Sequence, residues 1–177
     1  APIGDVCYTT NVSRSQFAFR FAAPAPSLAD LKKHLANWLK TTSKDASSLQ
    51  RTSGVPIAFM FSGQGAQWAG MAAQLYRTHS VFRNAMDRCH ALAQPHLEHG
   101  LLEVIFAREG GDALVNRTDY TQPALFAVEY ALAELLKSWG ISPDAVIGHS
   151  LGEFVAACTA GVMTLKTQCV SSLLAAH

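Results

Sequence analysis

The chain has 177 residues, enough for one ordinary domain or one and a half small ones, and 49% of them are hydrophobic. Charged residues make up 15% and the formal net charge is +1 without a basic or acidic run, so electrostatics gives no argument for nucleic acid or an anionic membrane as a partner. The four scattered cysteines lack metal-ligand spacing, and neither a secretory signal nor a membrane-spanning stretch is recognisable, which together predict a cytoplasmic protein without a metal site.

Residues 1–53 form a small first unit that ends in a polar, Ser/Thr-rich stretch of linker composition, residues 41–54. Phe17, Phe19 and Phe21 alternate with other residues and predict a strand with one aromatic face. Ser27 is expected to cap a helix in which leucines recur at helical spacing, at positions 28, 31, 35 and 39. We interpret this unit as a small α/β packing module without chemistry of its own.

The second unit, residues 54–177, alternates strands and helices. Residues 56–61 read as a strand, residues 68–76 as a helix, and Ser80 as the cap of a further helix that Pro95 bounds. Thr121-Gln-Pro123 is expected to open a helix with proline at its first position, and Gly140 to end it. A short buried strand at 145–147 and a helix at 151–160 follow. This order predicts a parallel sheet with helices on both faces.

The segment Gly148-His-Ser150-Leu-Gly152 has the pattern G-x-S-x-G between a strand and a helix, which is the setting of a nucleophile elbow. On so tight a turn, side chains two residues before and after the serine would collide, which favours glycine at both positions. The Leu151 N–H at the start of the next helix can donate to an oxyanion. The pattern predicts a catalytic serine, with a tight structural turn as the alternative.

A second strand-to-loop junction, Gly63-Gln64-Gly65, is expected to end at the same edge of the sheet. Its glycines let the backbone approach a ligand, and the Gln64 N–H could supply a second oxyanion donor. Taken alone, such a loop is more often a plain turn than a site, but its pairing with the elbow favours a site.

Three segments, Phe61–Met71, Thr121–Ala127 and Gly148–Glu153, occur in order and at family spacing. Together they closely resemble the malonyl-CoA:acyl-carrier-protein acyltransferase domains of polyketide and fatty acid synthases. The segment Tyr8–Ser15 resembles the linker that joins ketosynthase to acyltransferase in type I polyketide synthases. The resemblance covers nearly the whole chain and implies an α/β fold, with the linker unit (1–53) followed by an incomplete, hydrolase-like large subdomain (54–177).

By this resemblance, Ser150 attacks an acyl-CoA thioester, holds the acyl group as an ester and passes it to the phosphopantetheine thiol of an acyl carrier protein. Gln64 and Leu151 form the oxyanion hole through their backbone N–H groups. The resemblance implies no cofactor on the chain itself, and its partners are acyl-CoA, the carrier protein and a ketosynthase domain of the same polypeptide. The substrate-binding residues are expected to be Gly63, Gly65, Gln122 and His149, although His149 could equally be a packing residue.

Two family residues have no counterpart in the chain. The base histidine lies roughly a hundred residues beyond the serine in the family, and none of the six histidines other than His149 occupies a matching position. The arginine that grips a malonyl carboxylate would fall at Ala175, and no arginine follows Arg117. Either the tail beyond about Leu165 is not native, or the domain takes an uncharged acyl group.

Because the chain starts at Ala1 and stops at His177 without a terminating signal, we expect a piece of a longer protein. We expect this piece to be inactive by itself because the base histidine lies beyond its end. An inactive docking fragment and a serine esterase or thioesterase are the alternative functions. Leu151 beside the serine weakly favours malonyl over methylmalonyl, so the sequence leaves the acyl group open.

Overall fold

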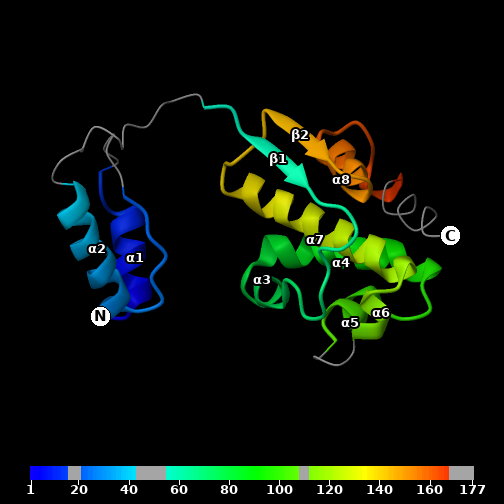
Figure 1. The fold of residues 1–177 in the computed structure, drawn as a ribbon, viewed down its shortest axis with the longest axis horizontal. Helices are drawn as coiled ribbons and strands as arrows, with labels where there is room; N and C mark the ends of the chain where they lie inside the picture. Colours follow the sequence, from blue (N-terminus) through cyan, green and yellow to red (C-terminus); the bar gives the residue numbers. More distant parts are fainter. Residues whose placement is uncertain (16–20, 43–54, 108–111, 168–177) are drawn as a thin grey trace. The chain divides into compact units, whose positions relative to one another are not determined.

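The computed structural model describes residues 1–15, 21–42, 55–107 and 112–167 (Figure 1). They divide into two compact units, Ala1–Val55 and Pro56–His177. The chain is mixed α/β, mostly helical with a small parallel sheet, which confirms the predicted fold class. None of the described helices is both long and apolar enough to cross a membrane.

In the described residues of the first unit there are two helices, α1 (Ile3–Val12) and α2 (Leu28–Thr42). The predicted cap of α2 is confirmed, because the Asp30 N–H donates to Ser27 Oγ at 3.2 Å and Ser27 Oγ donates to Asp30 Oδ2 at 2.6 Å. Helix α1 was not predicted, since it is rich in β-branched residues and lacks a side-chain cap. Of the predicted aromatic strand, Phe17 and Phe19 lie outside the described residues, and Phe21 is in irregular backbone beside Trp38.

The second unit holds two parallel strands, β1 (Ala58–Phe61) and β2 (Ala145–Gly148), with Phe59 paired to Val146 and Phe61 to Gly148. Phe59 and Phe61 are buried against the helices, which confirms the first strand. The other face is open: Met60 is 80% and Ile147 58% exposed. The expectation of a sheet covered on both faces, with a buried second strand, is therefore wrong for the described residues. Side chains alternate along a strand, and the described helices cover one face only.

The helices between the strands are α3 (Ala73–Thr78), α4 (Ser80–Ala93), the 3₁₀ turn η2 (Gln94–His96), α5 (Leu101–Ile105), α6 (Asp112–Val115) and α7 (Thr118–Ser138); α8 (Leu151–Thr159) follows β2. The helix predicted at 68–76 begins only at Ala73, because Gly70 and Ala72 have positive φ angles that a right-handed helix does not allow. Ser80 is the first residue of α4 rather than its cap. His79 occupies the cap position; its backbone is extended and its side chain makes no capping hydrogen bond.

Helix α7 starts at Thr118, earlier than predicted, so Pro123 lies inside the helix and not at its first position. The early start is held by Thr121, whose Oγ1 donates to the carbonyls of Val115 at 2.6 Å and Arg117 at 2.9 Å. Its predicted end is confirmed: Gly140 has φ +79, and the Ile141 N–H donates to the Leu136 carbonyl at 3.0 Å.

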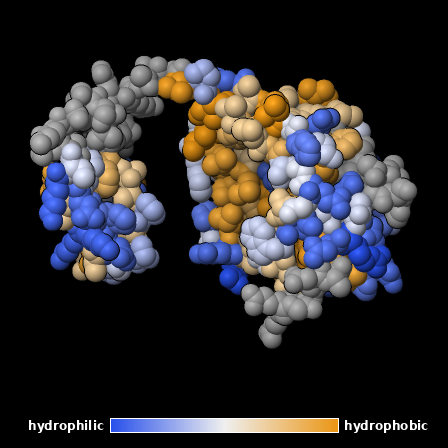
Figure 2. All heavy atoms as spheres, viewed as in Figure 1, coloured by the Kyte–Doolittle hydropathy of each residue, from blue (hydrophilic) through white to orange (hydrophobic). Residues whose placement is uncertain are grey.

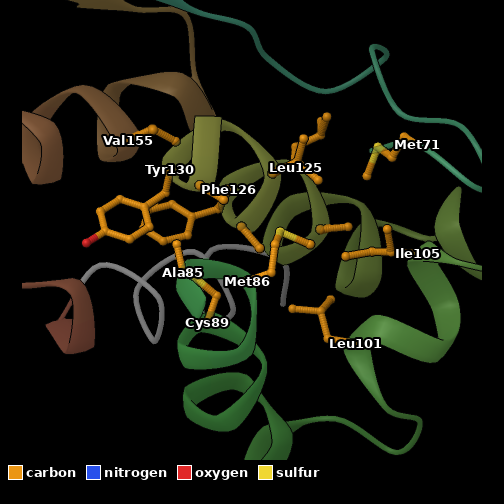
Figure 3. Packing of buried hydrophobic residues seen from close by; sticks show 14 of the residues in the cluster. Met71, Ala85, Met86, Cys89, Leu101, Ile105, Leu125, Phe126, Tyr130 and Val155 are labelled. Atoms are coloured by element: carbon orange, nitrogen blue, oxygen red, sulfur yellow. The ribbon is translucent and has the colours of Figure 1, made fainter. Parts of the chain in front are cut away.

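The core of the second unit is built around α7, which packs along α4 and contacts α5 and α8 (Figure 3). The rings of Phe126 and Tyr130 stack with centroids 6.2 Å apart. The residues labelled in Figure 3 all belong to this cluster: Met71, Ala85, Met86, Cys89, Leu101, Ile105, Leu125, Phe126, Tyr130 and Val155. Helix α7 is therefore the central helix of this core, and the strands join the core through Phe59 and Phe61 and through their contacts with α8.

The open face of the sheet should make the chain self-associate. Met60 and Ile147 are direct cross-strand partners on that face, so Met60→Lys with Ile147→Glu replaces an apolar pair by an opposite-charge pair. We expect sedimentation to show a larger monomer fraction, with the free energy of unfolding changed by less than about 1 kcal/mol. Val162→Lys, equally exposed but outside the sheet, is the control. Unchanged association in the double variant would contradict the role of this face.

Candidate active site

Ser150 lies at the predicted sharp turn. It separates the end of β2 at Gly148 from the start of α8 at Leu151, with φ 53° and ψ −115°. A positive φ is strained for a residue other than glycine and occurs mainly where function requires it. The Ser150 side chain is exposed, and within the described part of the chain no side chain makes a hydrogen bond to its hydroxyl. The serine is thus presented to solvent.

The two glycines of the motif are required by close backbone contacts. A Cβ on Gly148 would lie 2.1 Å from the Gly152 carbonyl carbon, and one on Gly152 would lie 2.5 Å from the Phe61 carbonyl oxygen. The collision predicted from the sequence is therefore present. The structure adds a third partner, the end of β1, against which the turn is pressed.

The loop after β1 lies beside the elbow. The His149 N–H donates to the Phe61 carbonyl at 3.1 Å, and a Cβ on Gly63 would lie 2.6 Å from His149 Nδ1. Gly63 and His149, both predicted from the sequence, are thus neighbours. The His149 side chain is exposed and so is not a core packing residue.

The remainder of this loop is fastened to the region where α7 begins. Gln64 Nε2 donates to Thr118 Oγ1 at 3.4 Å, and the Gly65 N–H donates to Gln67 Oε1 at 2.8 Å. Gln122, the fourth predicted substrate-binding residue, is half-buried one helical turn after Thr118 and on the same face of α7. The loop and this face of α7 therefore border one region.

Leu151 and Gln64, the two predicted oxyanion donors, lie in segments whose backbone N–H groups can face the elbow. Leu151 opens α8, and the first amides of a helix have no acceptor within the helix. Gln64 lies in the loop that follows β1, at the same carboxyl edge of the sheet as the elbow. The arrangement can present backbone N–H groups to a group bound at Ser150.

Glu129 on α7 belongs to this region and was missed by the sequence analysis. Its Oε1 accepts the Ser62 N–H at 2.9 Å and the Ser62 hydroxyl at 2.5 Å. Burial raises the pKa of the Glu129 carboxyl, and the two bonds from Ser62 oppose this shift only in part. The available signal was an acidic residue within the apolar run Phe126-Ala-Val-Glu-Tyr-Ala-Leu132.

No histidine ring in the described part of the chain makes a hydrogen bond to the Ser150 hydroxyl, and two of the rings have contacts elsewhere. His79 Nδ1 lies 2.8 Å from Thr78 Oγ1, and its ring meets Trp139; the His99 ring lies beside Tyr120. His177 and Ala175, the position expected for the arginine, are outside the described residues.

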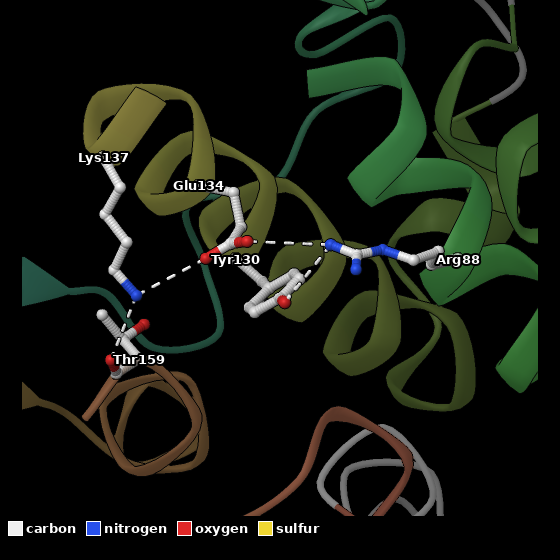
Figure 4. Close-up of polar contacts among 5 residues, drawn as sticks. All are labelled: Arg88, Tyr130, Glu134, Lys137 and Thr159. Carbon is white, nitrogen blue, oxygen red and sulfur yellow. Dashed lines mark hydrogen bonds and ion pairs between the residues drawn. The ribbon is translucent and has the colours of Figure 1, made fainter. Parts of the chain in front are cut away.

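A polar cluster connects α7 to α4 and to α8 (Figure 4). Glu134 pairs with Arg88 of α4 at 3.7 Å and with Lys137 at 3.4 Å, and Lys137 Nζ donates to the Thr159 carbonyl at 3.1 Å. Partly exposed ion pairs contribute little stability. The bond to Thr159, however, satisfies a carbonyl at the end of α8, the helix that begins at the elbow.

Comparisons with known proteins agree on one family. The profile of the family described as acyl transferase domain matches residues 58–174, which includes most of the tail after Leu165. Orsellinic acid synthase ArmB of Armillaria ostoyae is 38% identical over 169 residues, 93% of this chain and 7% of that protein. The chain spans 2–9% of the length of the curated relatives it matches.

Two solved structures extend these matches. The acyltransferase domain of the second module of the salinomycin polyketide synthase has a TM-score of 0.68 and 38% identity, covering 87% of this chain and 36% of that one. A malonyl-transacylase in complex with a type II polyketide synthase acyl-carrier protein has a TM-score of 0.61 and 29% identity, covering 69% and 38%.

The close contacts at the elbow make a clear stability prediction. Gly152→Ala forces a methyl group against the backbone of β1, which cannot move without breaking the strand pair, so we expect a loss of more than about 3 kcal/mol. Gly100→Ala is the matched control, because its methyl meets only the flexible Glu103 side chain, and it should cost less than about 1 kcal/mol. Chemical denaturation measures both. Equal losses would show that the elbow tolerates a side chain.

The raised pKa of Glu129 predicts a pH-dependent stability. A carboxyl whose pKa is raised on folding binds more protons in the folded state, so stability from this group is present below its ordinary value of 4.5 and is lost as pH rises through the folded pKa. The difference in unfolding free energy between the unsubstituted chain and Glu129→Gln should therefore shift in favour of the unsubstituted chain as pH falls. A difference that does not vary with pH would contradict this.

Proposed function

This chain belongs to the acyl transferase domain family, and from that membership we propose that it carries the nucleophile of an acyltransferase acting in polyketide biosynthesis. The observation that carries the proposal is the exposed Ser150 on its strained elbow, with the Gly63–Gly65 loop beside it. A malonyl-type thioester of coenzyme A is the proposed substrate.

In the first half-reaction the Ser150 hydroxyl attacks the thioester carbonyl. The carbon–sulfur bond breaks, coenzyme A leaves as its thiol, and the acyl group remains as a serine ester. The negative charge that develops on the carbonyl oxygen needs fixed donors, which we assign to the backbone N–H groups of Gln64 and Leu151. The position of both residues at one edge of the sheet supports this assignment.

In the second half-reaction a phosphopantetheine thiol on an acyl carrier protein attacks the ester. A thioester to the carrier forms and the serine hydroxyl is regained, so the chain itself needs no cofactor. The similarity to a malonyl-transacylase seen in complex with an acyl-carrier protein supports this partner. We propose the ketosynthase of the same polypeptide as a second partner, in line with the resemblance of the first unit to an inter-domain linker.

The substrate contacts are proposed for Gly63, Gly65, Gln122 and His149. The neighbouring positions of Gly63 and His149, and the shared face of Gln122 and the loop anchor Thr118, support this set. The base that takes the Ser150 proton is proposed to come from outside residues 1–177. The lack of a hydrogen bond to the Ser150 hydroxyl among the described side chains is consistent with that.

The test is covalent labelling by radiolabelled malonyl-CoA, with acetyl-CoA in a parallel arm. General-base assistance is worth roughly 10²–10⁴-fold, so the chain alone should label slowly and added imidazole should accelerate labelling. Ser150→Ala should abolish labelling in both conditions. Fast labelling without imidazole would place the base inside the chain. No serine-dependent labelling under any condition would overturn the proposed function, and a preference for acetyl-CoA would overturn the malonyl-type substrate.

A further inference from the structure

Glu129 joins α7 to the first residue of the loop after β1. One carboxylate oxygen, Oε1, accepts both the backbone N–H and the hydroxyl of Ser62, although the two residues are 67 positions apart. Hydrogen bonds to a carboxylate are about twice as strong as those between neutral groups. The loop is thereby attached at its first residue to a helix that lies in the core.

The surroundings of Glu129 are energetically unfavourable for a carboxylate, which loses hydration there. Glu129 is half-buried beside a groove of about 380 Å³ whose other lining is mostly apolar, with Phe59, Phe61 and Leu132 among its residues. Figure 2 shows hydrophobic residues gathered over β1 and the adjoining part of α7. The second oxygen, Oε2, is enclosed and has no hydrogen-bond partner among the described residues. An apolar residue would fit this environment with less desolvation.

The loop needs such an anchor because its own backbone is permissive. Gly63 and Gly65 flank Gln64, and Gly65 has φ +117. Glycine adopts many backbone conformations at little steric cost. The Gln64 side chain itself is weakly held, since it meets Thr118 at 3.4 Å, whereas the two bonds from Ser62 measure 2.5 Å and 2.9 Å. On the far side of Gln64 the loop is held by Gln67, whose Nε2 donates to Asn116 Oδ1 at 3.0 Å. Ser62 therefore fixes the strand side of the loop that carries the Gln64 N–H.

We propose that Glu129 is a positioning residue that, through Ser62, holds the Gln64 N–H toward the acyl oxygen bound at Ser150. The proposal rests on the proposed function, because it assigns the loop an oxyanion role. Glu129 touches neither the acyl group nor Ser150 in this role. It fixes the donor before the substrate arrives, so that no reorganisation is needed when charge develops.

The first measurement is hydrogen exchange of the peptide that contains residues 62–67 in the full chain, which needs no acyl chemistry. Glu129→Ala removes the acceptor of both bonds and should speed exchange there about tenfold or more, because opening the loop no longer requires two hydrogen bonds to break. Ser62→Ala, which keeps the backbone bond, should give a smaller increase. Glu129→Gln keeps an acceptor oxygen and should stay near the unsubstituted chain. Leu132→Ala, which lines the same groove on α7, is the matched control and should leave this peptide unchanged.

The second measurement is the imidazole-assisted acylation of Ser150 as a function of malonyl-CoA concentration. Loss of one oxyanion donor costs on the order of 10²–10³ in rate, so a misdirected Gln64 N–H should lower the maximal rate of Glu129→Ala at least about tenfold with little change in the half-saturating concentration. Glu129→Gln should restore most of the rate. Circular dichroism identifies any variant that does not fold, and Ser62→Ala, altered at an exposed residue, keeps the test decisive in that case.

The outcomes separate the two proposals. Faster exchange at 62–67 with an unchanged acylation rate would overturn the positioning role and leave the acyltransferase function standing. Unchanged exchange in both Glu129→Ala and Ser62→Ala would overturn the anchor itself. If the unsubstituted chain shows no serine-dependent acylation, the proposed function fails and the positioning role falls with it, whereas faster exchange would still identify Glu129 as a structural anchor.

Discussion

The close approach of three backbone segments is the constraint on which this structure depends. The end of β2, the first turn of α8 and the end of β1 come so near one another that neither Gly148 nor Gly152 has room for a single methyl group. This contact forces the turn at Ser150 into its positive φ angle and exposes the serine. It also sets the strand register, since the pairing of Phe61 with Gly148 places the loop after β1 next to His149. Strain at Ser150 persists because the surrounding backbone leaves no alternative.

Helix α7 stabilises the approach of these three backbone segments. Its apolar face forms the core with α4, α5 and α8, while polar residues of the helix bond to the segments that form the site. Glu129 holds Ser62 at the start of the loop, and Lys137 bonds to Thr159 at the far end of α8. The nucleophile turn and the loop thus share one rigid support. Such preorganisation is what electrostatic catalysis requires, because donors that are already fixed do not need to reorient during the reaction.

The sheet shows where a sequence pattern and the described structure differ. The apolar runs at 56–61 and 145–147 are typical of parallel strands covered on both faces, and the prediction of a buried second strand followed from that pattern. Among the described residues, helices cover only the face of Phe59 and Phe61, which leaves Met60 and Ile147 exposed. An apolar run specifies that both faces can be buried. It carries no information about whether a covering element is present in the same stretch of chain.

The sequence by itself determined the features that depend on a few neighbouring residues: the Ser27 cap, the stop at Gly140 and the elbow around Ser150. Each is set by backbone sterics or by a hydrogen bond within one turn, so the residue types are sufficient. Only the tertiary structure decided that Glu129 meets Ser62, that Gly63 adjoins His149 and that α7 begins at Thr118 with Pro123 inside it. The first two contacts join residues far apart in the chain, and the third relies on a buried threonine. Each depends on how the chain packs, which propensity and spacing do not encode.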